Sequence, residues 1–157
     1  MLTDRTLFLD RDGVVNVLLV NDYVKNVSEL EIREDFIESI PLILKNFGKV
    51  FIVTNQQGVG KGLMTEDDLQ RVHDYFLQQV AQAGGRVDRI YYCTALKSAH
   101  SFRRKPSIGM ALQARRDFAD VALKQSVMVG DEPLTATRYP HLVDYCYPTL
   151  FDYAKTL

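Results

Sequence analysis

Cysteine is scarce in this sequence, and it has neither long apolar runs nor an excess of charge of either sign. The two cysteines, Cys93 and Cys146, can form at most one disulfide, too few for a secreted framework, which predicts a protein of the reducing cytoplasm. The longest apolar runs, such as 50–53, have four residues, whereas a bilayer span needs about 20. A net charge of -1 provides no basic field to collect nucleic acid or anionic lipid. We therefore expect no membrane association and no nucleic-acid partner.

Length and composition indicate one globular domain. The chain has 157 residues, of which 46% are hydrophobic and 25% are charged. This length is close to that of a typical single domain, and the composition is typical of a packed, ordered protein. No internal repeat or low-complexity linker divides the sequence. We expect a single domain over residues 1–157.

Short apolar runs alternate along the chain with amphipathic stretches. The runs predict buried strands, and apolar residues recurring every three or four positions predict helices. Strands that alternate with helices favour right-handed crossovers and a mainly parallel sheet with helices on both faces. The pattern therefore predicts an α/β fold. The expected strands are 6–9, 50–53, 90–93, 126–129 and 145–147, and the expected helices are 36–47, 65–83 and one that begins after residue 107.

Several residues predict where these helices begin and end. Thr65 and Asp68 form a capping box for the second helix, and glycines at 84–85 end it. Ser107 is expected to cap the third helix. Pro41 lies inside the first expected helix and should kink it or mark a late start.

Neither long connection in the chain has room for a large cap domain. Residues 14–30 mix apolar and polar residues with turn formers, which predicts a loop or hairpin. The stretch 55–105 is mostly taken up by one helix and one strand. We therefore expect a site that is open to solvent.

Polar side chains follow the predicted strands at the points where those strands end. Because the carboxyl ends of parallel strands share one edge of a sheet, these side chains are expected to meet in one crevice. Three carboxylates there suit Mg²⁺, which prefers oxygen ligands and takes one or two carboxylates together with a substrate phosphate. The residues are Asp10, Asp12, Thr54, Asn55 and Asp131 at strand ends, with Lys105 just before a helix.

Four segments resemble, in order and over nearly the whole chain, the four motifs of the haloacid dehalogenase (HAD) superfamily of phosphatases. Similarity is greatest to the branch of histidinol-phosphate phosphatases and D,D-heptose 1,7-bisphosphate phosphatases. The resemblance implies a HAD-like, Rossmann-like three-layer α/β/α sandwich with a mainly parallel sheet and no large cap domain. The segments are Phe8-Leu9-Asp10-Arg11-Asp12-Gly13-Val14-Val15-Asn16, Val53-Thr54-Asn55-Gln56 within the turn Thr54-Asn55-Gln56-Gln57-Gly58, Arg104-Lys105-Pro106 and Val129-Gly130-Asp131.

The resemblance also implies a role for each catalytic residue. Asp10 would attack phosphorus and form an aspartyl-phosphate, which splits one difficult displacement into two easier steps. Asp12 would protonate the leaving alkoxide and later deprotonate the attacking water. Thr54 and Asn55 would donate hydrogen bonds to the phosphoryl oxygens, and Lys105 would neutralise the charge that gathers on the transferred group.

The metal and the substrate body are assigned in the same way. Mg²⁺ would be held by the carboxylates of Asp10 and Asp131 and by the backbone carbonyl of Asp12. Arg104 would reach the polar body of the substrate.

The sequence departs from the family at two places. Many members of the branch have a zinc-binding loop of cysteines and histidines before the third motif, but here that loop retains only Cys93 and His100. Two ligands cannot complete a four-coordinate structural site, so we expect no zinc. In the fourth motif, Thr135 stands where the superfamily usually has a second acid, and Glu132 is the nearest residue that could replace it.

Two histidines outside the motifs are interpreted as structural or solvent-facing, and a glycine-rich turn is interpreted as structural. His73 lies beside the apolar stripe of the helix 65–83, and His100 lies in a polar loop without a partner at ligand spacing. The turn 58–62 lacks the first glycine and the Ser or Thr of a nucleotide-binding loop. We assign no catalytic or binding role to any of the three.

Together these features predict a Mg²⁺-dependent phosphatase acting on a small phosphorylated metabolite, such as heptose 1,7-bisphosphate or histidinol phosphate. An open site would also admit extended substrates, so a nucleic-acid 3′-phosphatase is an alternative, although the net charge argues against it. The alternative from a different class of function is a phosphate-binding module with weak or no catalysis. Pure binding needs neither a nucleophile nor an acid, so the presence of Asp10, Asp12 and Lys105 favours the enzyme.

Overall fold

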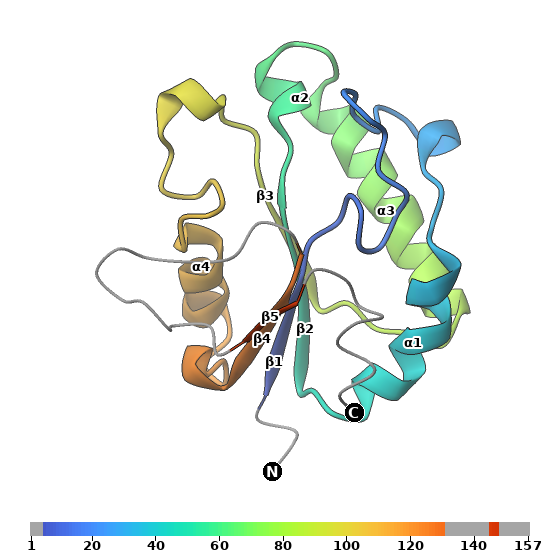
Figure 1. The fold of residues 1–157 in the computed structure, drawn as a ribbon, viewed down its shortest axis with the longest axis vertical. Coiled ribbons are helices and arrows are strands. Elements are labelled where there is room, and N and C mark those ends of the chain that lie inside the picture. Colours follow the sequence, from blue (N-terminus) through green and yellow to red (C-terminus); the bar gives the residue numbers. More distant parts are fainter. Residues whose placement is uncertain (1–4, 131–144, 148–157) are drawn as a thin grey trace.

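Five parallel strands form one sheet in the computed structural model, which describes residues 5–130 and 145–147 (Figure 1). The strand order is β3-β2-β1-β4-β5, so the first strand lies at the centre. All five strands were predicted from the sequence within a few residues of their bounds. Those bounds are β1 Thr6–Leu9, β2 Lys49–Asn55, β3 Arg89–Cys93, β4 Ser126–Val129 and β5 Tyr145–Tyr147.

Helices cover both faces of this sheet. In Figure 1, α1 and α3 lie on one side of the strands and α4 lies on the other, which gives three layers. The HAD-like α/β/α architecture is thereby confirmed. The helices are α1 Glu34–Leu44, α2 Gln57–Gly60, α3 Glu66–Gln82 and α4 Gly109–Asp117, with short 3₁₀ turns η2 Val27–Glu29, η3 Lys97–Ala99 and η4 Leu123–Gln125.

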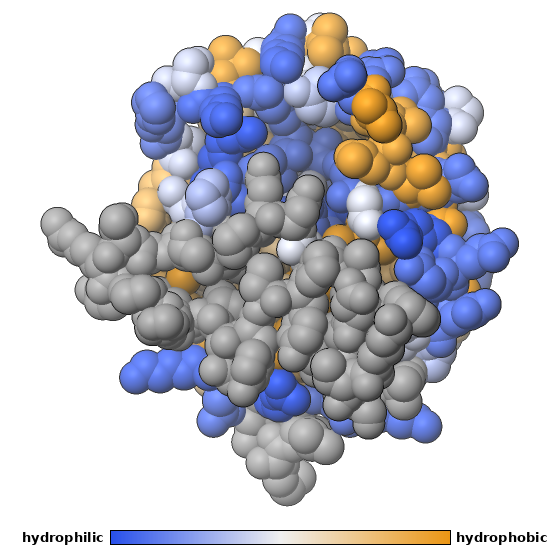
Figure 2. All heavy atoms as spheres, in the orientation of Figure 1, coloured by the Kyte–Doolittle hydropathy of each residue, from blue (hydrophilic) through white to orange (hydrophobic). Residues whose placement is uncertain are grey.

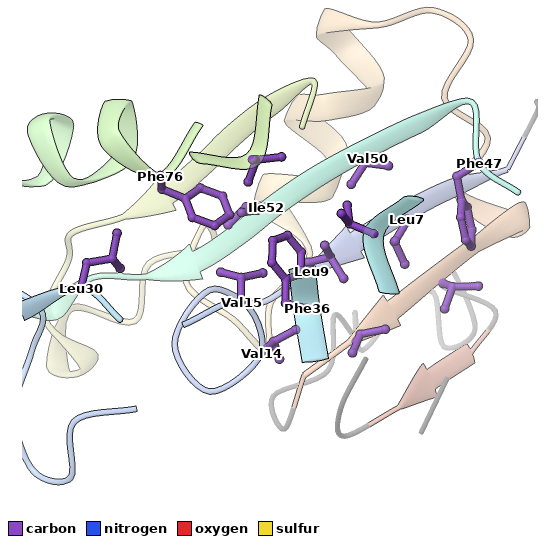
Figure 3. Packing of buried hydrophobic residues seen from close by; sticks show 14 of the residues in the cluster. Leu7, Leu9, Val14, Val15, Leu30, Phe36, Phe47, Val50, Ile52 and Phe76 are labelled. Atoms are coloured by element: carbon purple, nitrogen blue, oxygen red, sulfur yellow. The ribbon is translucent and has the colours of Figure 1, made fainter. Parts of the chain in front are cut away.

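The two faces of the sheet bury two separate apolar clusters. Side chains alternate along a strand, so Leu7 and Leu9 pack under α1 and α3, whereas Phe8 packs under α4. Figure 3 shows the first cluster, in which the rings of Phe36 and Phe76 lie 5.8 Å apart. Burial on both faces explains why each strand reads as a continuous apolar run.

The ends of the helices were predicted with mixed success. The capping box is present: Thr65 and Asp68 each accept a hydrogen bond from the other's backbone. Ser107 as the cap of α4 was wrong, because Ile108 is the first flanking residue and no side chain caps that helix. Pro41 marks no late start: α1 begins at Glu34 and ends at Leu44, short of the predicted end at 47.

The connection after β1 is a loop whose two ends pair through an isolated antiparallel bridge between Asn16 and Ile32. The backbone of Val17 bonds to Glu31, and Arg33 bonds to Val15, so the ends of the loop are held together. Three exposed apolar side chains lie in the segment 17–20, namely Val17, Leu18 and Val20. In the residues that the structure describes, no helix is long and apolar enough to cross a membrane.

Candidate active site

A cavity of about 210 Å³ opens at the carboxyl ends of the central strands. Asp10 follows β1 directly, Asn55 ends β2, and both line this cavity. Asp12, Arg104 and Lys105 also line it, so five of the residues singled out in the sequence meet there. Figure 2 shows that the visible surface in the upper part of this face, above the grey atoms, is mainly hydrophilic, with apolar side chains gathered to one side.

Asp10 is a buried carboxylate paired with a buried ammonium. Its Oδ1 accepts a hydrogen bond of 2.8 Å from the backbone N–H of Arg11 and lies 2.9 Å from Lys105 Nζ. The Asp10 side chain is only 11% exposed and that of Lys105 only 1%. Burial raises the pKa of Asp10, and the positive charge of Lys105 offsets part of that effect. An anionic nucleophile thus lies beside the group that can neutralise a phosphoryl oxygen.

Asn55 holds the backbone of Lys105 in place. Its Oδ1 accepts from the Lys105 N–H at 2.9 Å, and its Nδ2 donates to the Lys105 carbonyl at 3.1 Å. Both ends of the amide therefore bind one residue that lies 50 positions later in the chain. Donation by this amide to phosphoryl oxygens stays a prediction, and the observed contacts add a part in fixing the lysine.

Asp12 accepts hydrogen bonds from three side chains. Arg11 Nη2 at 2.8 Å and Asn16 Nδ2 at 3.0 Å both bind its Oδ1, while Gln56 Nε2 at 2.9 Å binds its Oδ2. Burial alone would raise the pKa of Asp12, but the Arg11 charge and these hydrogen bonds outweigh it and hold the pKa below its usual range. These contacts therefore favour the ionised form of the carboxyl group.

Gln56 was missed as a functional residue, although it lies in the turn that carries the second motif. It is fully buried, and its Nε2 donates to both Asp12 Oδ2 and Thr54 Oγ1, each at 2.9 Å. Thr54, the predicted phosphate donor, is buried beside it at the end of β2. The amide of Gln56 thus links the second motif to the acid of the first.

Arg11 and His73 form a buried contact beside Asp12 that no pattern in the sequence indicated. The Arg11 side chain is completely buried, and its Nη1 lies 3.1 Å from His73 Nε2. His73 is buried on α3, as a structural interpretation predicted, but its partner is a charged residue that lies between Asp10 and Asp12 in the sequence. Burial and the Arg11 charge lower the pKa of His73 to about 3.

Tyr23 brings the loop after β1 to the rim of the cavity. Its hydroxyl accepts a hydrogen bond from Gln57 Nε2 at 3.2 Å, and Lys61 Nζ lies 5.3 Å from its ring centre. Hydrogen bonding to Lys61 lowers the pKa of this phenol. Its place beside the site follows from tertiary packing, for which the sequence around it carries no signal.

The predicted cation ligands are only partly within the described residues. Asp131 lies outside them, as do Thr135 and Glu132, and residues 5–130 with 145–147 contain no group of three or more His, Cys, Asp or Glu that could hold a metal. The donors that are present fit a hard cation, because Asp10 Oδ1 takes both described contacts and leaves Oδ2 available. A Cβ at Gly130 would lie 2.8 Å from Asp10 Cβ, so glycine leaves room beside that carboxylate.

Cys93 and His100, the two residues that remain of the family's zinc-binding loop, differ in their exposure to solvent. Cys93 is buried at the end of β3, with Sγ 3.8 Å from Ser101 Oγ. His100 is exposed, in a left-handed backbone conformation. The absence of zinc stays a prediction.

Comparison with known proteins identifies the family. The model of the polynucleotide kinase 3 phosphatase family matches residues 4–145. The chain belongs to this family. This phosphatase is 35% identical over 127 residues to the D-glycero-alpha-D-manno-heptose-1,7-bisphosphate 7-phosphatase of Campylobacter jejuni, covering 81% of this chain and 71% of that protein.

Further relatives agree on the type of enzyme. The D-glycero-beta-D-manno-heptose-1,7-bisphosphate 7-phosphatase of Helicobacter pylori is 30% identical over 133 residues, covering 84% of this chain and 75% of that protein. A crystal structure of the D,D-heptose 1,7-bisphosphate phosphatase of B. bronchiseptica, complexed with magnesium and phosphate, is 34% identical with a TM-score of 0.73. That match covers 81% of this chain and 70% of the other. The protein is a HAD-type phosphoric monoester hydrolase.

Proposed function

We propose that this phosphatase hydrolyses a phosphate ester of a small sugar in the presence of Mg²⁺, with D,D-heptose 1,7-bisphosphate as the first candidate. The observation that carries the proposal is the ion pair between Asp10 and Lys105, buried at the end of β1 beneath an open polar cavity. A nucleophilic carboxylate next to a lysine that can bind phosphoryl oxygens is the arrangement that phosphoryl transfer requires.

In the first step, a carboxylate oxygen of Asp10 forms a bond to phosphorus as the bond to the ester oxygen breaks. The electron pair leaves with that oxygen, which takes a proton from Asp12. Asp12 first takes up this proton from water as the phosphate binds, because a neighbouring anion favours the neutral form of a carboxyl group. Lys105 and the Thr54 hydroxyl stabilise the charge on the equatorial oxygens. The product of this step is an aspartyl-phosphate on Asp10 and a free sugar hydroxyl.

In the second step, water attacks the phosphorus of the aspartyl-phosphate and releases inorganic phosphate. Asp12, which became a carboxylate in the first step, takes the proton of that water. Three hydrogen-bond donors favour its ionised form, which suits its use as a base. When phosphate leaves, Asp12 releases this proton to water, and both aspartates are again carboxylates.

The residues proposed to hold Mg²⁺ are Asp10 and Asp131 through their carboxylates and Asp12 through its backbone carbonyl. When bound, the cation offsets the repulsion between the Asp10 carboxylate and the phosphate anion. The raised pKa of Asp10 supports this, because a buried carboxylate gains from a nearby positive charge. The named crystal structure with magnesium and phosphate supports it further.

The names of the relatives support a heptose bisphosphate as the substrate. One relative is named for the alpha anomer and another for the beta anomer, so both anomers are candidates. Arg104 lines the cavity and is proposed to contact the sugar or its second phosphate. A nucleic-acid 3′-phosphatase is the second candidate, favoured by the description of the matching family.

A panel of four substrates tests the proposal. Phosphate release is measured with Mg²⁺ for both anomers of D,D-heptose 1,7-bisphosphate, for histidinol phosphate and for a 3′-phosphorylated oligonucleotide, with Asp10→Asn as the inactive control. We expect kcat/KM to be highest for one heptose anomer by at least about tenfold. A higher value for the oligonucleotide would replace the sugar with a nucleic acid as the substrate.

Three expectations from the sequence remain part of the proposal. These are a single domain over residues 1–157, the absence of structural zinc and a location in the cytoplasm. They are supported by the matched range 4–145, by the two remaining zinc-loop ligands and by the low cysteine content.

A further inference from the structure

Arg11 is a buried cation beside the reacting groups. Its side chain has no exposed surface, its backbone N–H donates to Asp10, and its Nη2 donates to Asp12. A guanidinium has five N–H donors and no acceptor, so each buried N–H needs an acceptor from another group. Its Nε has none among the described residues, which makes the partner of Nη1 more important for holding the group in place.

The partner of Nη1 is His73 Nε2, at 3.1 Å. Because a guanidinium can only donate, the imidazole nitrogen must accept, and the ring must be neutral with its proton on Nδ1. Burial and the neighbouring positive charge, which lower the pKa of His73 to about 3, agree with this assignment. His73 is therefore a neutral acceptor for the guanidinium of Arg11.

The helix that carries His73, α3, holds this side chain in a fixed position. Val72 and Phe76, on either side of His73 in the sequence, are fully buried against the sheet, and the capping box fixes the start of α3. In Figure 1, α3 runs beside the segment that follows β1, and the Arg11–His73 contact joins the two. A residue of α3, 62 positions later in the sequence, thus helps to hold the guanidinium of Arg11 in place.

The position of Arg11 decides how the two oxygens of Asp12 are used. Among the residues that the structure describes, Oδ1 accepts from both Arg11 and Asn16, whereas Oδ2 accepts from Gln56 alone. A carboxylate oxygen has two lone pairs, so Oδ1 is fully used and Oδ2 has one free. The proton that Asp12 gives and takes would therefore be carried on Oδ2. Loss of the Arg11 contact would free a lone pair on Oδ1 and let the carboxyl group turn.

We propose that His73 is a positioning residue of the phosphatase reaction, which holds Arg11 against Asp12 Oδ1 and so keeps Oδ2 as the oxygen that exchanges the proton. This inference rests on the acid–base role of Asp12 in the proposed function. It assigns a part in the reaction to a residue that touches neither substrate nor metal.

The test compares His73→Phe with His73→Gln. Phenylalanine keeps the ring volume but removes the acceptor, whereas glutamine offers a neutral oxygen acceptor at similar reach. The kcat/KM of each variant is measured with D,D-heptose 1,7-bisphosphate, an alkyl ester whose leaving group needs a proton, and with p-nitrophenyl phosphate, whose leaving group does not. Because kcat/KM reports the steps up to the first irreversible one, it isolates transfer to Asp10.

We expect His73→Phe to lower kcat/KM for the alkyl ester by about tenfold or more and for the aryl ester by less than about threefold, with glutamine restoring the alkyl value. Phe76→Leu is the matched control, since it weakens the core of the same helix without touching Arg11. It should lower the unfolding midpoint and leave the ratio of the two values unchanged. If His73→Phe does not fold, His73→Asn, whose oxygen is too short to reach Arg11, serves in its place.

Equal loss with both esters, or no loss with either, would overturn the role of His73. Glutamine failing to restore the alkyl value in a folded protein would also overturn it. Failure of the wild-type protein to release phosphate from both esters has a different meaning, because it would remove the proposed function itself and the inference with it.

Discussion

At the scale of single residues, the pair of Asp10 and Lys105 is the least expected feature of a stable protein. Moving two charges out of water costs several kcal/mol for each ion, and their attraction repays this only with good geometry and further hydrogen bonds. Both side chains are nearly inaccessible, and they approach to 2.9 Å. Such a pair is explained by chemistry that needs both charges, because apolar side chains of similar volume would serve stability equally well.

Asn55 is predicted to act through Lys105. Asn55→Ala removes the two hydrogen bonds to the Lys105 backbone and is expected to lower kcat by about tenfold, because a displaced ammonium stabilises the transferred group less well. Steady-state kinetics of Asn55→Ala, Lys105→Ala and the double variant measure whether the two effects are independent.

If Asn55 acts through Lys105, the double variant loses no more activity than Lys105→Ala alone. Losses that multiply would show that the amide binds the phosphoryl group directly, as the second motif alone suggested. The cycle therefore decides between the two roles without a bound ligand.

At the scale of secondary-structure elements, the site depends on how closely the ends of two neighbouring strands approach. The backbone N–H of Asp10 bonds to the carbonyl of Val129 at the end of β4, and Gly130 follows directly. A Cβ at position 130 would lie 2.8 Å from Asp10 Cβ, which is closer than real side chains come. Because Gly130 has no side chain, the backbone of the fourth motif can approach the side chain of Asp10 closely.

Gly130→Ala is therefore predicted to displace Asp10 and to lower kcat by about tenfold to a hundredfold. Gly84→Ala is a matched control at the end of α3, where φ is +77° and nothing lies within 4 Å of the added methyl group. That substitution should cost about 1 kcal/mol of stability through backbone strain and leave kcat unchanged. A similar loss of kcat in both variants would mean that position 130 acts through stability only.

The sequence allowed most of the elements to be predicted, and the errors have physical causes. The capping box of α3 was found because it is local, with both partners within four residues. Ser107 failed as a cap because the helix begins one residue later than such a cap requires, with Ile108 as the N-cap, and the N–H of Gly109 donates to the carbonyl of Phe102. Pro41 is accepted within α1 because Phe36 and Ile40, which lie on the same helix, are fully buried and hold it to the sheet.

At the scale of the whole molecule, the site residues divide into those with sequence motifs and those without. Asp10, Asp12 and Lys105 follow from short motifs: the first two lie within three residues of the end of β1, and Lys105 lies in the loop that precedes α4. The contact of Arg11 with His73 spans 62 residues and that of Gln56 with Asp12 spans 44. Such contacts depend on how strands and helices pack, which local patterns in one sequence do not specify.

The central claim is that phosphate passes through a covalent bond to Asp10, and trapping that intermediate tests it most directly. Asp12→Asn should accept the phosphoryl group from p-nitrophenyl phosphate, whose leaving group needs no proton, but should hydrolyse the aspartyl-phosphate slowly because the base is lost. The reaction is quenched in acid, and peptide mass spectrometry locates the added group.

We predict one phosphoryl group on the peptide that contains Asp10. It should form with Mg²⁺, should not form when the metal is chelated before the substrate is added, and should be absent when Asp10 is also changed to Asn. Release of p-nitrophenol by Asp12→Asn with no phosphoryl group on the protein, or with the group on another residue, would contradict the account.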